Sequence, residues 1–192
     1  MGALKLPFRS SIFSEAPKKN GLIYFVGDSQ TEAFELNEFL GNPNVRNRGI
    51  WGDKSDGILR RIDSIAILKP SKVFIMIGVN DVHDGARVEE VFENIKEVIA
   101  KIQTMSPYTI IYVQSVLPTD QTIFHSEEPS THNIVRLNKM YQTLDNGKNI
   151  LFINLYPHFL ANGTLKKELS FDNVHLTGKG YALWAKLLKP YL

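Results

Sequence analysis

Five short apolar runs recur along the 192-residue chain, and this repetition restricts the fold more than any other feature. The runs occupy residues 22–26, 44–47, 73–77, 109–114 and 150–154, and the run at 44–47 is the weakest. Short runs rich in Val, Ile and Tyr, apolar on both faces, are typical of strands buried inside a parallel sheet. The pattern therefore predicts a sheet of five parallel strands.

Segments with helical periodicity separate these runs. Between residues 88 and 102, apolar side chains return every third or fourth position, which predicts a helix with one apolar face. Similar segments span residues 31–40, 56–68, 133–144 and 178–188. Alternating strands and helices predict an α/β protein, a three-layer α/β/α sandwich of flavodoxin-like type with right-handed crossovers. We expect functional residues at the carboxyl ends of its strands.

The composition is that of an ordinary globular domain. Hydrophobic residues make up 43% and charged residues 22% of the chain, which argues against disorder, coiled coils and repeats. This length suits one domain with a sizeable core. We expect residues 22–192 to form that domain and residues 1–21 to be an N-terminal extension. The net charge of +2, without a long basic block, gives no case for a nucleic acid or an anionic membrane as partner.

Cysteine is absent, so disulfides, thiolate zinc sites and a cysteine nucleophile are excluded. No run approaches the roughly 18 apolar residues that a membrane helix needs, and the N-terminus lacks a signal-peptide core. We expect a soluble chain without a membrane span. The compartment stays open between the cytoplasm and a secreted or periplasmic location with the leader removed, and the oligomeric state is also open.

A serine and an acid–imidazole pair occupy positions suited to catalysis. Ser29 directly follows the first strand, within the segment Gly-Asp-Ser-Gln-Thr at 27–31, and Asp172 and His175 precede the last helix. Acyl transfer requires a nucleophile, a base within hydrogen-bond reach and a group that orients the base. Taken singly, Ser29 would more often cap a helix, Asp172 could equally cap its turn, and His175 could be a core residue. Their combination makes Ser29 a candidate nucleophile.

Two further strand ends offer hydrogen-bond donors. Residues 47–53 follow the second strand and contain Gly49 and Gly52, whose N–H groups could approach a reacting carbonyl because no Cβ intervenes. Asn80 follows the third strand and offers a side-chain amide, although asparagine at this place also favours a turn. We expect these segments and Ser29 to converge at one edge of the sheet.

Taken together, four segments resemble the four sequence blocks of the SGNH (GDSL-type) hydrolase superfamily. They are residues 27–29, the segment around Gly52, residues 78–81 and residues 172–175. Each block alone is weak evidence, but the four occur in the family's order and at its approximate spacing, from residue 22 to the C-terminus. Residues 111–118 and 154–160 further resemble bacterial acylhydrolases related to platelet-activating-factor acetylhydrolase.

The resemblance implies the SGNH hydrolase fold and a role for each matching residue. It implies Ser29 as nucleophile, His175 as general base and then acid, and Asp172 as the carboxylate that holds the imidazole tautomer. The oxyanion hole would comprise the backbone N–H groups of Ser29 and Gly52 and the side chain of Asn80. Gly52 is preferred to the glycine three residues before it, because the family glycine immediately precedes an acidic residue, here residue 53.

Two residues depart from the family's usual pattern, and three aromatic residues are weak pocket candidates. Gln30 stands where Leu or Ile is usual, and Trp51 stands where a small residue is common. Trp51 could narrow an acyl pocket, and Trp51, Phe124 and Tyr156 could line a substrate pocket or simply pack. The irregular stretch at 117–131 has the length of a lid or binding loop, or of a plain connection.

The resemblance implies no cofactor, and we expect no metal. Asp81, His83 and Asp84 form a short cluster, but such clusters in loops are usually solvated, and the sequence offers no second group of ligands.

We expect a serine esterase that removes a short acyl group through an acyl-serine intermediate. The expected group is acetyl, and the expected substrate is a small-molecule or glycan ester. An acyltransferase that uses the same acyl-enzyme is the nearest alternative. A non-catalytic glycan-binding domain on a hydrolase scaffold is another. A nucleotide-binding protein is the weakest alternative, because residues 27–31 contain one glycine and phosphate-binding loops need more.

Overall fold

The computed structural model describes residues 2–120, 122 and 129–192, with residues 2–7 described by their backbone alone. Its centre is a five-stranded parallel sheet with the strand order β2-β1-β3-β4-β5, the flavodoxin-like order. The strands are β1 (Ile23–Gly27), β2 (Val45–Gly49), β3 (Lys72–Met76), β4 (Ile110–Gln114) and β5 (Ile150–Ile153). Each strand overlaps one of the five predicted runs, so the predicted α/β sandwich is confirmed.

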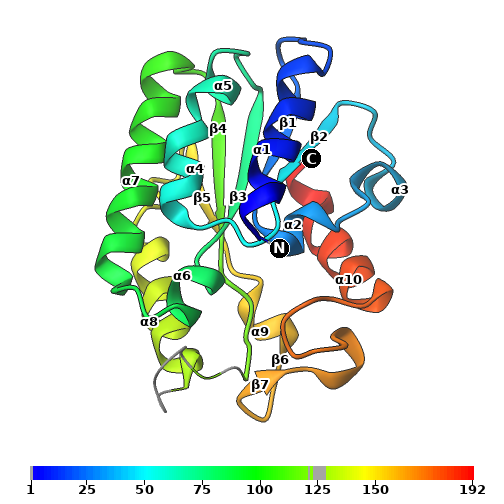
Figure 1. Cartoon of the computed structure of the whole chain (residues 1–192), viewed down its shortest axis with the longest axis vertical. Helices are drawn as coiled ribbons and strands as arrows, with labels where there is room; N and C mark the ends of the chain where they lie inside the picture. Colours follow the sequence, from blue (N-terminus) through cyan, green and yellow to red (C-terminus); the bar gives the residue numbers. More distant parts are fainter. Residues whose placement is uncertain (1, 121, 123–128) are drawn as a thin grey trace.

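Helices cover both faces of the sheet, which Figure 1 shows nearly edge-on. One layer contains α4 (Ser55–Arg61), α5 (Asp63–Ala66), α6 (Val79–His83), α7 (Val88–Met105) and α8 (Ser130–Gln142). The other contains α2 (Ser29–Glu32), α3 (Leu36–Leu40), α9 (Tyr156–Phe159) and α10 (Gly178–Leu188). Each layer has its own apolar core, exemplified by Ile95 of α7 on the first face and Trp184 of α10 on the second.

The segment predicted as one helix over 31–40 forms two short helices, α2 and α3. The side-chain amide of Asn47 on β2 donates hydrogen bonds to the carbonyl oxygens of Thr31, Glu32 and Phe34. A continuous helix would pair such carbonyls with N–H groups four residues further on. The Phe34 ring also packs 4.8 Å from the Trp184 ring, which anchors this break under α10. The predicted helix over 56–68 is likewise divided, into α4 and α5.

Several elements were not predicted, and the largest is an N-terminal helix, α1 (Gly2–Glu15). Arg9 on α1 donates a hydrogen bond to the carbonyl of Gly49 at the end of β2 and pairs with Glu32. The Phe13 ring lies 4.6 Å from the guanidinium carbon of Arg48 on β2. We therefore propose that the N-terminal extension predicted at residues 1–21 docks through α1 on the domain that residues 22–192 form.

The other additions are small: α6 follows β3, and the remaining ones follow β5. They are α9, a hairpin of β6 (Leu160–Ala161) and β7 (Thr164–Leu165), and two single 3-10 turns, η1 (Lys167–Leu169) and η2 (Lys189–Tyr191). The hairpin and η1 lie at the lower end of the molecule in Figure 1, beyond the carboxyl ends of the strands. The chain passes through α9, the hairpin and η1 to reach the segment that carries Asp172 and His175, whereas η2 follows α10.

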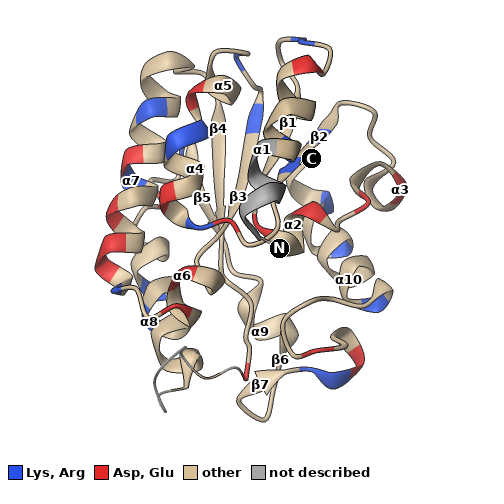
Figure 2. Ribbon diagram, in the orientation of Figure 1, with Lys and Arg blue, Asp and Glu red and all other residues tan. Residues whose placement is uncertain are grey.

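Charged side chains of both signs are spread over the helices (Figure 2). On α7, for example, Lys96 pairs with Glu93 on the exposed face. None of the described helices combines the length and apolarity needed to cross a membrane. The stretch at 117–131 is described only in part: Thr131 donates a hydrogen bond to the carbonyl of Thr119, and residues 121 and 123–128 lie outside the described residues. Its role as lid or connection stays a prediction.

Candidate active site

Ser29 is the first residue of α2, immediately after β1. Asp28 caps this short helix, because its side chain accepts a hydrogen bond from the N–H of Gln30 at 2.9 Å. The preceding Gly27 cannot be replaced without displacing backbone, since a Cβ there would lie 2.4 Å from the carbonyl oxygen of Met76 on β3. The tight turn thus holds Ser29 at the carboxyl edge of the sheet, where it is only 3% exposed.

His175 lies within hydrogen-bond reach of this serine, although the two residues are 146 positions apart. Ser29 Oγ and His175 Nε2 are 2.9 Å apart, and His175 Nδ1 lies 2.6 Å from Asp172 Oδ2. An ionised carboxylate only accepts hydrogen bonds. His175 Nδ1 therefore carries a proton and donates a hydrogen bond to Asp172. His175 Nε2 is then free of a proton and accepts the hydrogen bond of the Ser29 hydroxyl.

Asp172 makes the hydrogen bonds that both of its predicted roles require. One carboxylate oxygen, Oδ1, accepts the backbone N–H groups of Val174 and His175, and the other accepts the imidazole N–H. Burial acts to raise the pKa of Asp172, but the hydrogen bonds from His175 and Val174 outweigh it, and the pKa lies below its ordinary value. Asp172 therefore stays ionised around neutral pH, as the hydrogen-bonding pattern requires.

The two glycines after β2 differ in what surrounds them. The N–H of Gly49 already donates a hydrogen bond to the Asn47 side chain at 2.8 Å. A Cβ on Gly49 would also lie 2.2 Å from the backbone nitrogen of Glu32. Gly52, in contrast, adopts φ +75°, and a Cβ built there would meet no atom within 4 Å. The open space beside Gly52 favours it over Gly49 as the oxyanion donor.

Asn80 lies on α6, directly after β3, and its amide is tied to the Gly52 segment. Asn80 Nδ2 donates a hydrogen bond to the carbonyl of Asp53 at 2.9 Å, which leaves the second amide hydrogen for another acceptor. The Asp53 carboxylate is bound in turn by Arg61 at 2.8 Å, and burial raises the pKa of Asp53 although Arg61 opposes that shift. These contacts fix the Gly52 segment against α4 and α6.

The aromatic candidates have different surroundings. The Trp51 ring stacks on the His175 imidazole, with ring centres 4.4 Å apart and planes at 19°. Tyr156 lines a cavity of about 150 Å³ with residues of α8 and β5, and the hydrogen bond recorded for its backbone N–H goes to Ser115. Phe124 lies outside the described residues. Of the three candidates, the structure thus brings Trp51 against His175.

Two residues next to the site were missed by the sequence reasoning. The Phe171 ring lies 5.9 Å from the His175 ring and is 71% exposed, so a second aromatic side chain adjoins the imidazole. Gln30, first noted as a departure from the family, donates a hydrogen bond from Nε2 to the carbonyl of Val174 at 2.7 Å. That bond ties the serine turn to the histidine segment. The polar side chain of Gln30, in place of the usual Leu or Ile, was the feature of the sequence that could have indicated this contact.

The acidic cluster near α6 is engaged within the protein. Asp81 accepts hydrogen bonds from the backbone N–H and the hydroxyl of Ser55, and Asp84 pairs with Lys54. Among the described residues, no group of three or more His, Asp or Glu side chains is arranged to hold a metal ion.

Comparison with known proteins gives concordant results. The model of the GDSL-like lipase/acylhydrolase family matches residues 25–183. The platelet-activating factor acetylhydrolase IB subunit alpha2 of Rattus norvegicus is 28% identical over 176 residues, which are 88% of this chain and 73% of that protein. A protein from Streptococcus pneumonia described as a platelet activating factor is 26% identical and superimposes with a TM-score of 0.87, over 99% of this chain and 94% of its own.

A carbohydrate esterase of family 3 from Talaromyces cellulolyticus has the same fold. Its TM-score is 0.65 at 18% identity, over 89% of this chain and 95% of its own. At this level of identity the likeness concerns the fold alone.

Proposed function

The chain belongs to the GDSL-like lipase/acylhydrolase family and is a hydrolase that acts on esters, and we propose that it is a serine esterase for short acyl groups, acetyl above all. The observation that carries the proposal is the hydrogen-bonded series from Ser29 to His175 to Asp172, at 2.9 and 2.6 Å. Relatives named acetylhydrolases support the choice of the acetyl group.

In the first half of the proposed reaction, Ser29 Oγ bonds to the ester carbonyl carbon while His175 Nε2 takes the hydroxyl proton. The carbonyl π electrons move to the oxygen, and Asp172 stabilises the imidazolium that forms. When the carbonyl re-forms, the bond to the alcohol breaks and His175 gives its proton to the leaving oxygen. Water then attacks the acyl-Ser29 carbonyl with His175 again as base, which releases the acid and restores Ser29.

The developing oxyanion needs donors placed before the reaction begins. We assign this role to the backbone N–H groups of Ser29 and Gly52 and to the free hydrogen of the Asn80 amide. The link from Asn80 to the carbonyl of Asp53, next to Gly52, supports a joint role, because it holds two of the three donors together.

Exposed aromatic rings beside His175 support an ester of a small molecule or a glycan as the substrate. Trp51 is 40% exposed and Phe171 is 71% exposed, and both stack near the imidazole. Aromatic faces at the mouth of a site suit the apolar faces of a sugar ring or a short acyl chain.

The first test is hydrolysis of p-nitrophenyl acetate, butyrate and octanoate by the native chain and by Ser29→Ala. We expect the native rate to fall with acyl length and the variant to lose about a million-fold in kcat, as serine hydrolases do without their nucleophile. Ser11→Ala, at an exposed serine on α1, is the matched control and should keep the native rate. Equal rates from the native chain and Ser29→Ala would remove Ser29 from the mechanism.

A second measurement addresses the acyl-serine intermediate and the two alternatives. A fluorophosphonate should add once to the native chain, at Ser29 by peptide mass spectrometry, and should not add to Ser29→Ala. Faster consumption of ester in the presence of an alcohol acceptor would instead indicate an acyltransferase. Glycan binding that survives Ser29→Ala, with no ester hydrolysis by the native chain, would indicate a binding domain.

A further inference from the structure

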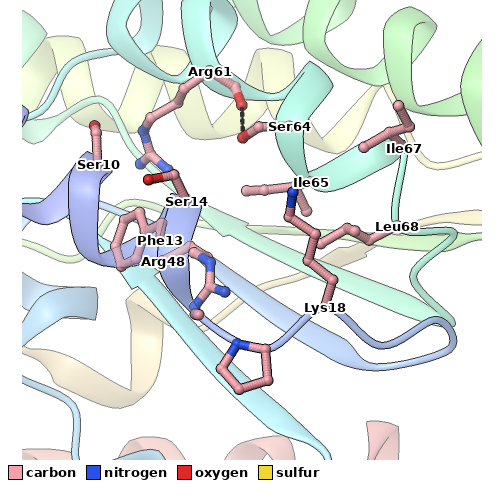
Figure 3. Close-up of a pocket in the computed structure, with 12 residues that line it drawn as sticks. Ser10, Phe13, Ser14, Lys18, Arg48, Arg61, Ser64, Ile65, Ile67 and Leu68 are labelled. Carbon is pink, nitrogen blue, oxygen red and sulfur yellow. Dashed lines mark hydrogen bonds between the residues drawn. The ribbon is translucent and has the colours of Figure 1, made fainter.

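A cavity of about 570 Å³ lies between α1 and the α4–α5 pair, next to β2. Figure 3 shows Phe13 of α1, Arg48 of β2 and Arg61 of α4 around it. Small-molecule sites in proteins commonly have volumes of about 300 to 1,000 Å³. Of the residues that line this cavity, Arg61 also binds the Asp53 carboxylate beside Gly52. Ser29, Asp172, His175 and the proposed oxyanion donors are not among the lining residues, so the cavity is separate from the catalytic series.

The cavity wall is rich in positive charge, and Asp53, which pairs with one of its cations, Arg61, lies outside the wall. Lys18, Arg48 and Arg61 line it, and the residues that line it include no Asp or Glu. Arg48 is only 8% exposed, and its guanidinium lies between the rings of Phe13 and Tyr24, at 4.6 and 5.2 Å. The hydrogen bond recorded for this guanidinium goes to its neighbour's backbone carbonyl, at residue 47. A nearly buried cation is thus held by two aromatic faces and a neutral acceptor.

The second arginine is incompletely satisfied. Two guanidinium nitrogens of Arg61 bind the Asp53 carboxylate, and one of them also reaches the carbonyl of Gly27. The remaining nitrogen, Nη1, is buried and has no hydrogen-bond acceptor among the described residues. A buried donor without an acceptor is unfavourable, and more so when it is charged. The wall therefore favours an added negative charge.

The cations also repel one another. Burial lowers the pKa of Arg48, and the nearby positive charges of Arg46, Arg9 and Arg61 lower it further. An anion in the cavity would oppose both effects on Arg48, because it would bring a negative charge to a wall whose lining residues include no Asp or Glu.

The rest of the wall is mainly apolar. Ile65, Ile67 and Leu68 line the side formed by α5 and the turn after it, opposite Phe13. Ile67 is 62% exposed, although it is a large aliphatic residue. This side offers surface to an apolar body and not to a second charged group.

We propose that this cavity binds a small amphipathic anion, with a carboxylate or phosphate oxyanion toward Arg48 and Lys18 and an apolar chain against Ile65 and Leu68. The shared chemistry is an oxyanion on an aliphatic body. Such a molecule could be a free fatty acid or an alkyl phosphate, and the experiment separates the two. The site is independent of the proposed esterase mechanism, so either proposal can fail without the other.

The test is isothermal titration calorimetry of the full chain with decanoate, decyl phosphate, decanol and inorganic phosphate. We expect one molecule of decanoate or decyl phosphate to bind per chain. The ligand with the higher affinity shows whether the site prefers a carboxylate or a phosphate. Decanol lacks the charge and inorganic phosphate lacks the chain, so each should bind at least about tenfold more weakly. Decanol binding as tightly as both anions, or no binding of either anion at millimolar concentration, would overturn the proposal.

Matched variants place the binding in this cavity. Arg48→Gln should weaken binding of the preferred anion by about tenfold or more, whereas Arg46→Gln, on the same strand but outside the wall, should change it little. Ser64→Trp should block the cavity from an exposed position on α5. If circular dichroism shows that Arg48→Gln does not fold, the affinity of Ser64→Trp tests whether the anion binds in this cavity. Unchanged affinity in Ser64→Trp, or lost affinity in Ser29→Ala, would contradict the assignment.

Discussion

Asp172 shows how a single residue can serve the local turn and the distant site at once. Its Oδ1 atom satisfies two backbone N–H groups of its own turn, while its Oδ2 atom accepts the His175 imidazole proton. The backbone contacts fix the carboxylate plane, so that the second oxygen faces Nδ1. The capping interaction and the orienting interaction are therefore parts of one arrangement.

This arrangement predicts different effects for two substitutions of Asp172. Asp172→Asn retains an oxygen for the turn but presents an amide N–H to His175 Nδ1, so the proton moves to Nε2 and faces Ser29. We expect kcat to fall about 10⁴-fold with the melting temperature nearly unchanged. Asp172→Ala should lose comparable activity and also lower the melting temperature. Ester hydrolysis and thermal unfolding measure both, and a native rate in Asp172→Asn would contradict the assigned tautomer.

Asn80 is predicted to act on the transition state more than on substrate binding. We expect Asn80→Ala to lower kcat by about 10² to 10³ with a small change in KM, because one preorganised oxyanion donor is lost. Steady-state kinetics with p-nitrophenyl acetate test this. Asn138→Ala is a useful comparison, since this buried amide binds the backbone of Val116 and should mainly affect the free energy of unfolding. An increase in KM alone would argue against an oxyanion role.

At the scale of elements, the short helix α2 depends on an unusual cap. Asp28 is fully buried, and burial raises its pKa to about 7, with a further contribution from the Asp53 and Asp81 carboxylates. The folded protein thus disfavours the ionised form of the Asp28 carboxyl group that caps α2. Burial with three acidic groups near one another makes the turn under Ser29 sensitive to pH.

The contribution of Asp28 to stability decreases as the pH rises. Between about pH 4 and 7, native Asp28 keeps its proton while the unfolded chain has lost it, so this residue's contribution to stability falls as pH rises. Asp28→Asn keeps an acceptor for the Gln30 N–H and removes the titration. We expect the variant's free energy of unfolding, relative to native, to increase from pH 4.5 to 7.5 in urea titrations. A difference independent of pH would contradict the prediction.

At the scale of the whole molecule, α1 is attached at one edge of the sheet through a few side chains. Phe13 lies against the guanidinium groups of Arg9 and Arg48, at 5.0 and 4.6 Å, and Arg9 reaches β2. This attachment encloses the proposed anion cavity and covers the β2 side of the sheet. The extension therefore completes a surface that the hydrolase domain alone would leave open.

Phe13→Ala should loosen α1 and leave the domain folded. Each cation–π contact contributes about 0.5 to 1 kcal/mol, so their loss should raise the population of detached helix several-fold. We expect faster trypsin cleavage after Lys18 and Lys19, with the main unfolding transition retained. Phe8→Ala, at a residue 64% exposed on the same helix, is the control and should change cleavage little. Equal cleavage rates in the two variants would show that Phe13 does not hold the helix.

Much of the molecule follows from local patterns in the sequence. A strand buried on both faces is mainly apolar, so β1, β3, β4 and β5 are visible without knowledge of their neighbours. The strand β2 carries Arg46, Asn47 and Arg48, and its run was accordingly the weakest. Alternation with amphipathic helices then leaves few topologies. Ser29 and Asn80 were selected as residues at strand ends, which converge in such a sheet. Asp172 and His175 were selected as an acid and imidazole pair before the last helix. The structure joins Ser29, His175 and Asp172 in one hydrogen-bonded series, and their roles stay predictions. α10, predicted at 178–188, is observed as Gly178–Leu188 because its periodicity is unbroken.

Only the tertiary structure decided features that depend on contacts between distant segments. Asn47, which lies on β2, interrupts the helix predicted at 31–40 by binding its carbonyl groups. Gln30 binds the carbonyl of Val174, which is 144 residues away. The stacking of Trp51 on His175 and the charged cavity under α1 likewise join segments with no shared periodicity. The sequence by itself determined which segments become strands and which residues lie at their ends, because those depend on local burial. The surroundings of each side chain depend on packing, which exists only once the chain is folded.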